Sequence, residues 1–490
     1  MNNRIDRQVL GVVVGVLALL IAFVFNIPAI SYAVTLVLVV LAFLQPKTGI
    51  YLLFVYFPAR ALLTEVAPSL KLLGDLLIIA AFLRIVWDQR NNWKSIFQFE
   101  KFEWAFIAFV ALGAIASLLN DVSIGAIVFQ IRAFVITFLL IYIVKRLRIT
   151  KDDIRLFLWI TFAMAMVIVL QAFIEKLSMR SAWMPEKWIN RQLSPGNASR
   201  IYGVLNNPNV LSVYLTIAAI LTIYLKRMMK PANWANIVFY ISLILLSGIW
   251  IMTYSRGTWI AVAIGLSLYV LYTRKWKFAV KVALVLALSF GAVVLPTTYA
   301  AQWIKQNTEI GNFERTGEVE EGPVVGAVEA DRLRETISAS TLEKSLTTGR
   351  LYVVVKGFEV YKDYPIIGSG FGTFGDSATK SYLSPIYADY GILTNIYADN
   401  QYIEIIAQNG TVGVILFAIF LLGMLWFFWK KRHVTPVAIP LVVSLIAIFW
   451  CGLVYNIWED KTFTLYYYTL TGAFIAFVRA KEQSNDSPHN

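Results

Sequence analysis

Apolar runs of similar length recur along most of the chain, and they constrain its fold more than any other feature. Each run approaches the roughly 20 residues that an α-helix needs to cross a hydrocarbon layer of about 30 Å. We place fourteen runs at about 9–25, 29–44, 50–64, 70–87, 104–119, 126–144, 155–174, 207–225, 235–252, 258–273, 278–295, 411–429, 436–456 and 463–478. Because unpaired backbone groups are costly in lipid, such runs cross a membrane as α-helices. The sequence therefore predicts an all-α polytopic membrane protein with about 12–14 transmembrane helices, since short runs such as 50–64 leave the count open.

The composition excludes a chain of soluble domains. Hydrophobic residues make up 58% of the 490 residues and charged residues 15%, against roughly 45–50% and about 25% in soluble globular proteins. The mean hydropathy of +0.66 agrees. The one cysteine, Cys451, excludes an intrachain disulfide and a cysteine-based metal site.

The distribution of positive charge predicts which side each loop faces. With the N-terminus in the cytoplasm, the segments on that side hold more than half of the 43 Lys and Arg residues, and the short loops at 26–28 and 120–125 hold none. This follows the positive-inside rule, so both termini are expected to be cytoplasmic. The net charge of +13 then records orientation, and no nucleic-acid partner is expected. The first run lacks a small-residue cleavage site and is followed at once by the second, so we expect it to remain as a span.

Two long segments, 175–206 and 296–410, fall on the outer side in this topology. In the first, Trp183 and Trp188 alternate with basic residues, which is typical of a segment in the membrane interface, with an ordinary loop as the alternative. The second is too long for a structureless loop, and we expect it to be partly helical, between 331 and 363. The expected organisation is N-terminal membrane helices at 1–174, a membrane core with outer-face motifs at 175–295, a large extracytoplasmic loop at 296–410, C-terminal membrane helices at 411–478 and a cytoplasmic tail at 479–490.

Two arginines at the outer ends of spans are candidates for binding an anion. Arg200 opens the sequence R-I-Y-G-V-L-N-N-P-N, and Arg256 lies in the tight turn Y-S-R-G between two spans. Pro208 suits the first turn of a helix, whose N-terminus offers free N–H groups. Arginine forks match phosphate oxygens, so two guanidiniums beside a helix N-terminus predict a diphosphate clamp. The alternative for Arg256 is an interfacial arginine whose charge reaches the water.

The end of the long loop carries carboxylates and a glycine-rich run. Asp399 and Glu404 lie near the outer mouth of the following span, where either is a candidate general base for a hydroxyl. The alternative is that both are solvated loop carboxylates. The run from Gly368 to Phe374 lacks the strand–helix setting of a dinucleotide site, and a tight re-entrant turn is the simpler interpretation.

The order of these motifs resembles the O-antigen ligase and Wzy-type polysaccharide polymerase family. The pattern is R-x-x-G-x-x-x-N-P-N, then S-R-G, then G-R before a helix, then P-x-x-G-x-G-x-x-x-F, then D-N-x-Y-x-E-x-x-x-x-G-x-x-G. It is carried by Arg200, Gly203, Asn207, Pro208, Asn209, Ser255, Arg256, Gly257, Gly349, Arg350, Pro365, Gly368, Gly370, Phe374, Asp399, Asn400, Tyr402, Glu404, Gly410 and Gly413. The motifs cover roughly 200–415, and the earlier spans resemble the family only in hydropathy.

The resemblance implies a metal-independent, inverting glycosyltransferase of GT-C-like fold that needs no cofactor. Its donor would be an undecaprenyl-diphosphate-linked saccharide on the outer face of the cytoplasmic membrane. Arg200, Arg256 and Arg350 would contact the diphosphate leaving group. The residues implied at the same substrate site are Asn207, Asn209, Asn400 and Tyr402. Asp399 and Glu404 are the implied catalytic carboxylates, and no metal ligand is expected.

The chain departs from ligases that attach O-antigen to lipid A core, because these carry a His where this chain has Asp399. Its two histidines, His433 and His489, fall on the cytoplasmic side of the predicted topology. The resemblance therefore favours a polymerase, of the type found in Gram-positive capsule or teichuronic acid synthesis, working with a flippase and a chain-length regulator. The alternatives are an O-antigen-type ligase, a peptidoglycan glycosyltransferase of the shape, elongation and division class, or a transporter of lipid-linked saccharide. A transporter would more often show internal repeats and broken helices at the membrane midplane.

Overall fold

A computed structural model describes residues 3–193, 195–308 and 349–486. Within these ranges an α-helix coincides with each of the fourteen predicted runs, and no strand is present. The helices are α1 (Asn3–Phe25), α2 (Pro28–Leu44), α3 (Pro46–Val66), α4 (Leu73–Asp88), α6 (Lys101–Leu119), α7 (Ile124–Val144), α8 (Lys151–Leu177), α11 (Pro208–Met229), α12 (Asn233–Met252), α13 (Arg256–Thr273), α14 (Trp276–Ser289), α20 (Gln401–Lys430), α21 (Ala438–Gly452) and α22 (Lys461–Asp486). A π-helical turn (Phe290–Val294) joins α14 to α15 (Leu295–Asn307).

Nine helices of the described ranges are long and apolar enough to cross a membrane. They include α3, which continues through Pro58 for 21 residues, so the run that seemed short at 50–64 belongs to a longer helix. The helices α2 and α21 are apolar but shorter. These findings confirm the all-α polytopic membrane fold.

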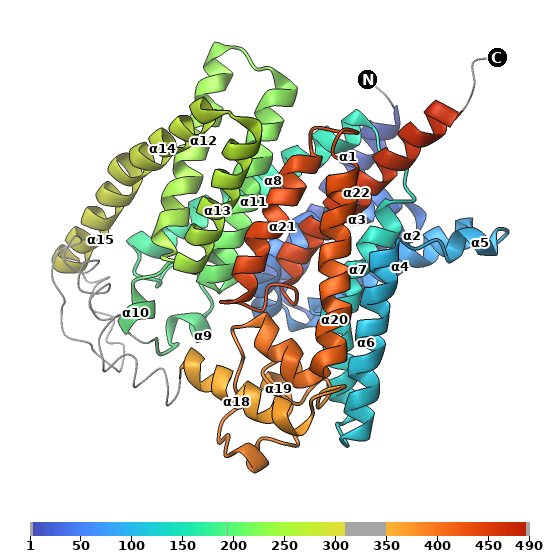
Figure 1. The fold of residues 1–490 in the computed structure, drawn as a ribbon. Helices are drawn as coiled ribbons and strands as arrows, with labels where there is room; N and C mark the ends of the chain where they lie inside the picture. The colour runs from blue at the N-terminus through green and yellow to red at the C-terminus, as the bar shows by residue number, and fades with distance from the viewer. Residues whose placement is uncertain (1–2, 194, 309–348, 487–490) are drawn as a thin grey trace. The chain divides into compact units, whose positions relative to one another are not determined.

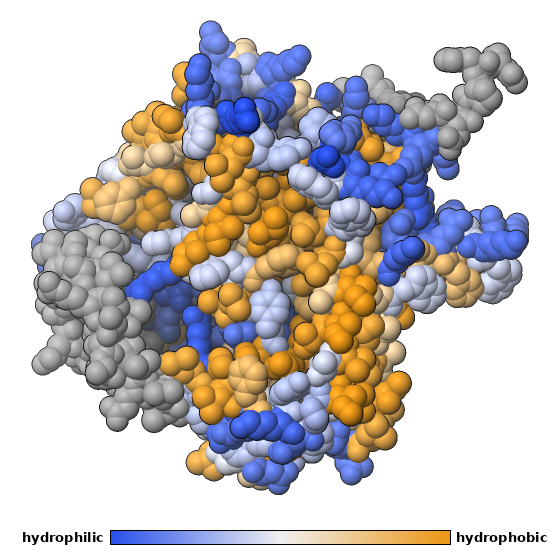
Figure 2. All heavy atoms as spheres, in the orientation of Figure 1, coloured by the Kyte–Doolittle hydropathy of each residue, from blue (hydrophilic) through white to orange (hydrophobic). Residues whose placement is uncertain are grey.

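The chain divides into two compact units. Of the described residues, unit 1 comprises those within 3–85, 147–259 and 270–308, and unit 2 comprises those within 86–146, 260–269 and 349–486. In unit 1, α3 packs against α1, α2 and α8, and α11 packs against both α8 and α12. In unit 2, α20 packs against α6 and α21, and α22 packs against α7 (Figure 1). Figure 2 shows apolar side chains on the visible faces of α6 and α20, as expected for surfaces that face lipid.

The segment 175–206 of unit 1 forms two short helices, α9 (Glu186–Ile189) and α10 (Pro195–Ala198). The two tryptophans of the predicted interfacial pattern lie differently. Trp183 is 75% exposed, whereas Trp188 is buried and donates its indole N–H to Glu65 at 3.4 Å. Only Trp183 therefore has the exposure that an interfacial side chain needs.

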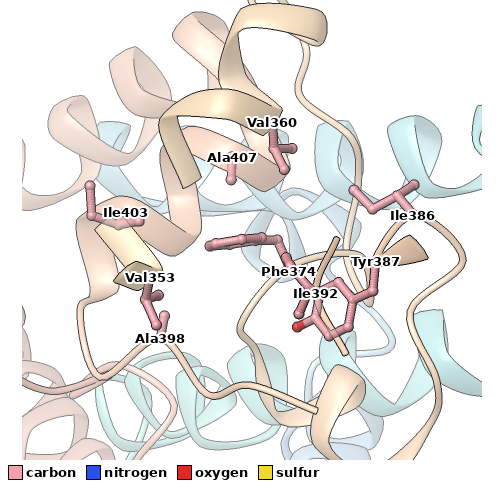
Figure 3. Close-up of a cluster of buried hydrophobic side chains, with 9 residues drawn as sticks. All are labelled: Val353, Val360, Phe374, Ile386, Tyr387, Ile392, Ala398, Ile403 and Ala407. Atoms are coloured by element: carbon pink, nitrogen blue, oxygen red, sulfur yellow. The ribbon is translucent and has the colours of Figure 1, made fainter. Parts of the chain in front are cut away.

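The described part of the long loop in unit 2 has a hydrophobic core of its own. Val353 and Val360 of α18 (Arg350–Asp363) pack with Phe374, Ile386, Tyr387, Ile392 and Ala398 from the loop and with Ile403 and Ala407 of α20 (Figure 3). The predicted helix at 331–363 is confirmed from Arg350 onward, and its earlier part lies outside the described residues. This core fixes the loop to the first turns of α20.

The helix α20 is broken at Gly410, and the loop completes the hydrogen bonds that the break leaves open. Gly410 has φ 58° and ψ −164°, a conformation almost confined to glycine. The N–H groups of Ser369 and Gly370 donate to the carbonyls of Ala407 and Gln408 at 3.0 and 2.7 Å. In return, the N–H groups of residues 411 and 412 donate to the carbonyls of residues 365 and 366.

The glycine-rich run is thus a re-entrant turn that pairs with a broken helix. Gly368, Gly370 and Gly372 have φ values of 78°, 97° and 75°, in the left-handed region that favours glycine. A Cβ atom at Gly370 would lie 2.2 Å from the backbone nitrogen of Ser117 in α6, so the close approach itself requires glycine. The predicted span that begins at 411 corresponds to the part of α20 after the break.

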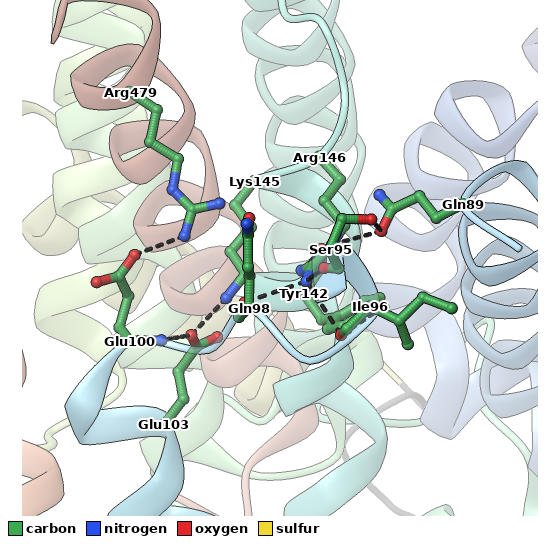
Figure 4. Close-up of polar contacts among 10 residues, drawn as sticks. All are labelled: Gln89, Ser95, Ile96, Gln98, Glu100, Glu103, Tyr142, Lys145, Arg146 and Arg479. Atoms are coloured by element: carbon green, nitrogen blue, oxygen red, sulfur yellow. Dashed lines mark hydrogen bonds and ion pairs between the residues drawn. The ribbon is translucent and has the colours of Figure 1, made fainter. Parts of the chain in front are cut away.

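Near the N-terminus of α6 and the C-termini of α7 and α22, a network of charged side chains links α22 and the α5–α6 connection to α7. Lys145 forms an ion pair with Glu103, and both side chains are fully buried. Arg479 pairs with Glu100 at 2.7 Å, and Arg146 donates to the carbonyls of 95, 96 and 98 around α5 (Trp93–Ile96) (Figure 4). Burial lowers the pKa of Lys145 to about 8, with the neighbouring carboxylate of Glu103 opposing this shift. The basic residues here, identified from the sequence only as orientation signals, also hold the unit together.

Candidate functional site

In unit 1 the side chain of Asn209 joins the two arginine motifs. Its Oδ1 atom accepts a hydrogen bond from Nη2 of Arg200 at 2.8 Å and another from the hydroxyl of Ser255 at 2.9 Å. Ser255 directly precedes Arg256, so the R-x-x-G-x-x-x-N-P-N and S-R-G sequences meet in one cluster. The structure therefore brings together Arg200, Asn209 and the turn that carries Arg256.

The guanidinium of Arg200 is held in a fixed orientation. Besides its bond to Asn209, it donates from Nε to the carbonyl of Thr253 at 2.8 Å and from Nη1 to Asn197 Oδ1 at 3.2 Å. Each acceptor is neutral, so the positive charge is oriented without being neutralised by these bonds. Preorganised cations of this kind stabilise a leaving anion at little reorganisation cost.

Arg256 is the first residue of α13 and its side chain is exposed. The preceding turn is sharp because Tyr254 adopts a left-handed backbone with φ 49°. The N-terminus of α13 carries the positive end of the helix dipole beside this arginine. An anion at this position would meet both an exposed guanidinium and the N–H groups of the first helical turn.

Asn207 caps α11. Its Oδ1 atom accepts the N–H groups of Asn209 and Val210 at 2.9 and 3.2 Å, and Pro208 occupies the first helical position. The N-P-N sequence therefore starts a helix and at the same time places Asn209 against Arg200. The predicted contact of Asn207 with substrate stays a prediction.

In unit 2 the D-N-x-Y-x-E sequence forms the start of α20. Asp399 is half-buried and has φ 46°, and the preceding N–H, of Ala398, donates to the carbonyl of Gly375 at 2.8 Å. Asn400 is the N-cap, with Oδ1 accepting the N–H groups of residues 402 and 403 at 3.1 and 3.2 Å. Tyr402 donates its hydroxyl to the carbonyl of Phe449 in α21 at 2.8 Å. These contacts fix the backbone on both sides of Asp399.

Glu404 is buried in the same unit, at 1% exposure. Its Oε2 atom accepts hydrogen bonds from Gln401 at 3.2 Å and from Asn456, and its carboxyl group lies beside that of Glu459. This burial excludes the alternative that Glu404 is a solvated loop carboxylate. Asp399 and Glu404 thus differ in access although they are close in sequence.

Residues 241–418 match the sequence profile of a family described as O-antigen ligase. The matched stretch includes the S-R-G turn, α18, the glycine-rich turn and the start of α20, whose geometry is given above. This stretch of the chain is similar to an O-antigen ligase domain. This confirms the resemblance on which the sequence analysis relied. No curated protein matches the chain.

Members of this family are glycosyltransferase-like ligases and polymerases of polysaccharide synthesis, which act on lipid-linked saccharides in a membrane, and the match supports a function of this type. The Arg200 motif lies outside the matched stretch. It is joined to the O-antigen ligase domain by the hydrogen bonds that Arg200 and Ser255 both make to Asn209. Arg350, inside the domain, is the first residue of α18, and its side chain is exposed.

Sequence reasoning missed two buried glutamates that support the candidate residues. In unit 1, the carboxylate of Glu175 accepts the N–H groups of Tyr202 and Gly203 at 3.0 and 2.6 Å, directly after Arg200. In unit 2, Glu459 accepts a hydrogen bond from Gln130 at 2.7 Å and the N–H of Ser377 at 3.2 Å. Each glutamate lies at the end of an apolar run, which was the available sequence signal for a buried acid.

Glu459 also affects Asp376, the N-cap of the short helix α19 (Ser377–Ser381). The two oxygens of Asp376 accept the N–H groups of Gly372 and Thr379, each at 2.7 Å. Burial is the largest cause that raises the pKa of Asp376, and the charge of Glu459 is the next; together they raise it from 3.8 to about 6.

Among the described residues, no group of three or more His, Cys, Asp and Glu is placed to hold a metal ion. Metal-independent chemistry stays a prediction.

The raised pKa of Asp376 predicts a pH-dependent stability. Because the folded state binds this proton more tightly than the unfolded chain, the stabilisation is complete below pH 3.8 and is lost as the pH rises through about 6. Between pH 5 and 7.5 we expect the loss of about 1 kcal/mol of unfolding free energy from this group. Asp376→Asn removes the titrating carboxyl group, although its amide nitrogen cannot accept the second of the two N–H groups. The variant should therefore be less stable at every pH but lack this component in the pH profile of the thermal unfolding midpoint.

The control is Asp389→Asn, an exposed aspartate of the same loop. It should leave the pH profile unchanged. An unaltered slope in Asp376→Asn would contradict the assignment.

Proposed function

We propose that the chain is a membrane glycosyltransferase that polymerises undecaprenyl-diphosphate-linked oligosaccharide repeats on the outer face of the cytoplasmic membrane. The main support is the Arg200–Asn209–Ser255 cluster, which places an oriented guanidinium beside the turn carrying Arg256. A diphosphate that departs from a sugar needs this kind of charge stabilisation. The products would serve cell-surface polysaccharide synthesis, of the capsule or teichuronic acid type.

The proposed reaction is an inverting displacement. An acceptor hydroxyl attacks the anomeric carbon of the donor from the face opposite the diphosphate, forming the new glycosidic bond. The bond from the anomeric carbon to the diphosphate oxygen breaks, and undecaprenyl diphosphate leaves with its charge stabilised by Arg200, Arg256 and Arg350. The hydroxyl proton passes to a carboxylate. These cations would make a bound metal unnecessary for the departure of the diphosphate.

Asp399 is the better candidate for the carboxylate that takes the proton. Its side chain is half-buried, whereas Glu404 is 1% exposed and engaged by Gln401 and Asn456. A general base must reach the proton that it removes. Glu404 then serves the site by holding the start of α20, together with Asn400 and Tyr402.

The absence of a histidine at position 399 favours polymerisation over ligation to a lipid core. His433 follows the far end of α20 from Asp399, and His489 lies outside the described residues. In the proposed topology the start of α20 faces the outside and His433 faces the cytoplasm. A flippase that supplies repeats and a chain-length regulator are the expected partners.

The deciding experiment uses the purified full chain in proteoliposomes with a defined lipid-linked repeat. A polymerase yields a ladder of glycans on undecaprenyl diphosphate and releases undecaprenyl diphosphate. A single transfer to a different acceptor would indicate a ligase. Movement of the lipid-linked repeat between leaflets without any new glycosidic bond would indicate a transporter, and either result would overturn the proposal.

Asp399→Asn is expected to lower turnover by a factor of about 10²–10⁴, the usual contribution of a general base. Asparagine tolerates the left-handed backbone at this position, so the loss would be chemical and not conformational. Turnover is measured as release of undecaprenyl diphosphate per enzyme, with Asp389→Asn as the matched control. Unchanged turnover in Asp399→Asn would assign the proton to Glu404 or to no protein base.

A further inference from the structure

Arg180 of unit 1 is a buried arginine with two unused donors. Arg180 lies in the turn that follows α8, and its exposed fraction is 4%. Its Nη1 and Nη2 atoms are both buried, and neither has a hydrogen-bond partner among the described residues. Buried guanidinium nitrogens are costly when unsatisfied, so such a group requires an explanation.

A second guanidinium lies against the same aromatic ring. The guanidinium carbon of Arg180 is 4.1 Å from the centroid of the Tyr202 ring, and that of Arg191 is 6.0 Å from it. Arg191 is exposed, and so gives this group a side that faces solvent. Tyr202 follows Arg200 by two residues, so the pair lies on the segment that carries the proposed diphosphate clamp.

The nearby carboxylate does not use up this positive charge. Glu175 reaches only Nε of Arg180, at 3.7 Å, and its two oxygens already accept the N–H groups of Tyr202 and Gly203. Glu175 thus leaves both Nη atoms of Arg180 without a hydrogen-bond partner among the described residues. The two Nη atoms of Arg180 form the side of the fork that matches phosphate oxygens.

The turn that carries Arg180 is strained. Met179, Arg180 and Trp183 have φ values of 52°, 68° and 56°, and none is a glycine. Strained non-glycine residues cluster at ligand clamps because the strain can be released when the segment moves. Since the Nη atoms are covered in the structure, entry of an anion requires such a movement of the turn.

We propose that Arg180 and Arg191, which both contact the Tyr202 ring, form a second phosphate-binding subsite, which takes the diphosphate of the acceptor repeat. The inference rests on the proposed function, because a polymerase of lipid-linked repeats holds two diphosphates at once. Arg200 and Arg256 would bind the diphosphate that leaves, and Arg180 and Arg191 the one that remains on the product. The shared chemistry also fits a phospholipid headgroup or free phosphate, and the test separates these sources.

The test counts binding sites on the full chain in nanodiscs of phosphatidylcholine, with a labelled short-chain polyprenyl diphosphate as the probe. The wild-type protein should bind two equivalents. Arg191→Gln and Arg180→Lys should each weaken one equivalent at least tenfold, and Arg256→Ala should weaken the other. Lys187→Gln, an exposed basic residue of the same segment that pairs with Glu65 at 3.2 Å, is the matched control and should change neither. Arg191 is exposed, so its variant tests the subsite without disturbing the folded core.

Two further arms identify the ligand. Inorganic pyrophosphate should compete at both sites, and phosphatidylglycerol added to the nanodisc should leave the Arg191-dependent equivalent in place. Displacement of that equivalent by phosphatidylglycerol would assign the subsite to a lipid headgroup and overturn the proposal. Binding of one equivalent, unaffected by Arg180→Lys and Arg191→Gln, would overturn it as well.

Kinetics separate this proposal from the proposed function. Arg191→Gln should raise the KM for an acceptor repeat at least tenfold and leave kcat unchanged. An unchanged acceptor KM in a protein that still makes polymer would refute the subsite alone. A wild-type protein that makes no glycosidic bond would refute the proposed function, whatever the number of binding sites.

Discussion

Arg256→Ala is expected to lower polymer formation by a factor of about 10²–10³, the usual loss when one donor to a developing anion is removed. Its side chain is exposed at the first position of α13, so the variant should fold and remain in the membrane. Arg256→Lys should recover only part of the activity, because an ammonium cannot form the two parallel bonds of a guanidinium. Polymer length and yield are measured in proteoliposomes with equal amounts of inserted protein.

The chain offers a matched control on the same helix. Arg274, exposed at the C-terminal cap of α13, is an arginine at the opposite end from Arg256. Arg274→Ala should leave polymer formation unchanged. If Arg256→Ala and Arg200→Ala both produced wild-type polymer, the diphosphate clamp would be wrong.

Gly410→Ala is expected to prevent unit 2 from folding. A Cβ atom at Gly410 would lie 2.6 Å from the backbone nitrogen of Gly368 and 2.6 Å from the carbonyl of Ile366, and neither backbone group can move without breaking the pairing with α20. The backbone conformation adds about 1–3 kcal/mol of strain for any other residue. Together these effects should exceed about 4 kcal/mol, a loss that few membrane domains tolerate.

The measurement is the yield of monodisperse protein after detergent extraction, with thermal unfolding where protein is obtained. Gly391→Ala is the control, since Gly391 also has a positive φ, 63°, but a Cβ atom there would meet nothing within 4 Å. It should cost only about 1 kcal/mol, from the backbone conformation alone. A Gly410→Ala protein as stable as Gly391→Ala would show that the break in α20 is not required.

The sequence predicted the helices well because each apolar run reports its own environment. Hydropathy alone located α1 to α4. The assignment of each loop to one side of the membrane from its positive charges also required no knowledge of tertiary contacts. The motifs were also informative: Asn209 and Ser255 are 46 residues apart, and their sequences, predicted to work together, are joined in the structure by a hydrogen bond.

Partnerships between distant residues were not predictable in the same way. Glu459 lies 82 residues from Ser377 and 329 from Gln130, and nothing local marks it as their acceptor. The capping roles of Asn207 and Asn400 were hidden because a cap and a ligand contact both use a polar residue before a helix. The left-handed backbone of Asp399 is set by the bond of Ala398 to Gly375 and by the cap of α20, so it too depends on tertiary structure.

The break in α20 also bears on the order in which the chain can be assembled during synthesis. Residues 365–370, which satisfy the break, and the stretch of α6 around Gly113 and Ser117, which bonds to Phe371 of the same turn, all precede Gly410 in the sequence. The ribosome has therefore delivered every partner of the break before residue 410 leaves the exit tunnel. The first turns of α20 can dock onto finished segments as they emerge, whereas the bond from Asn456 to Glu404 must wait for the connection that follows α21.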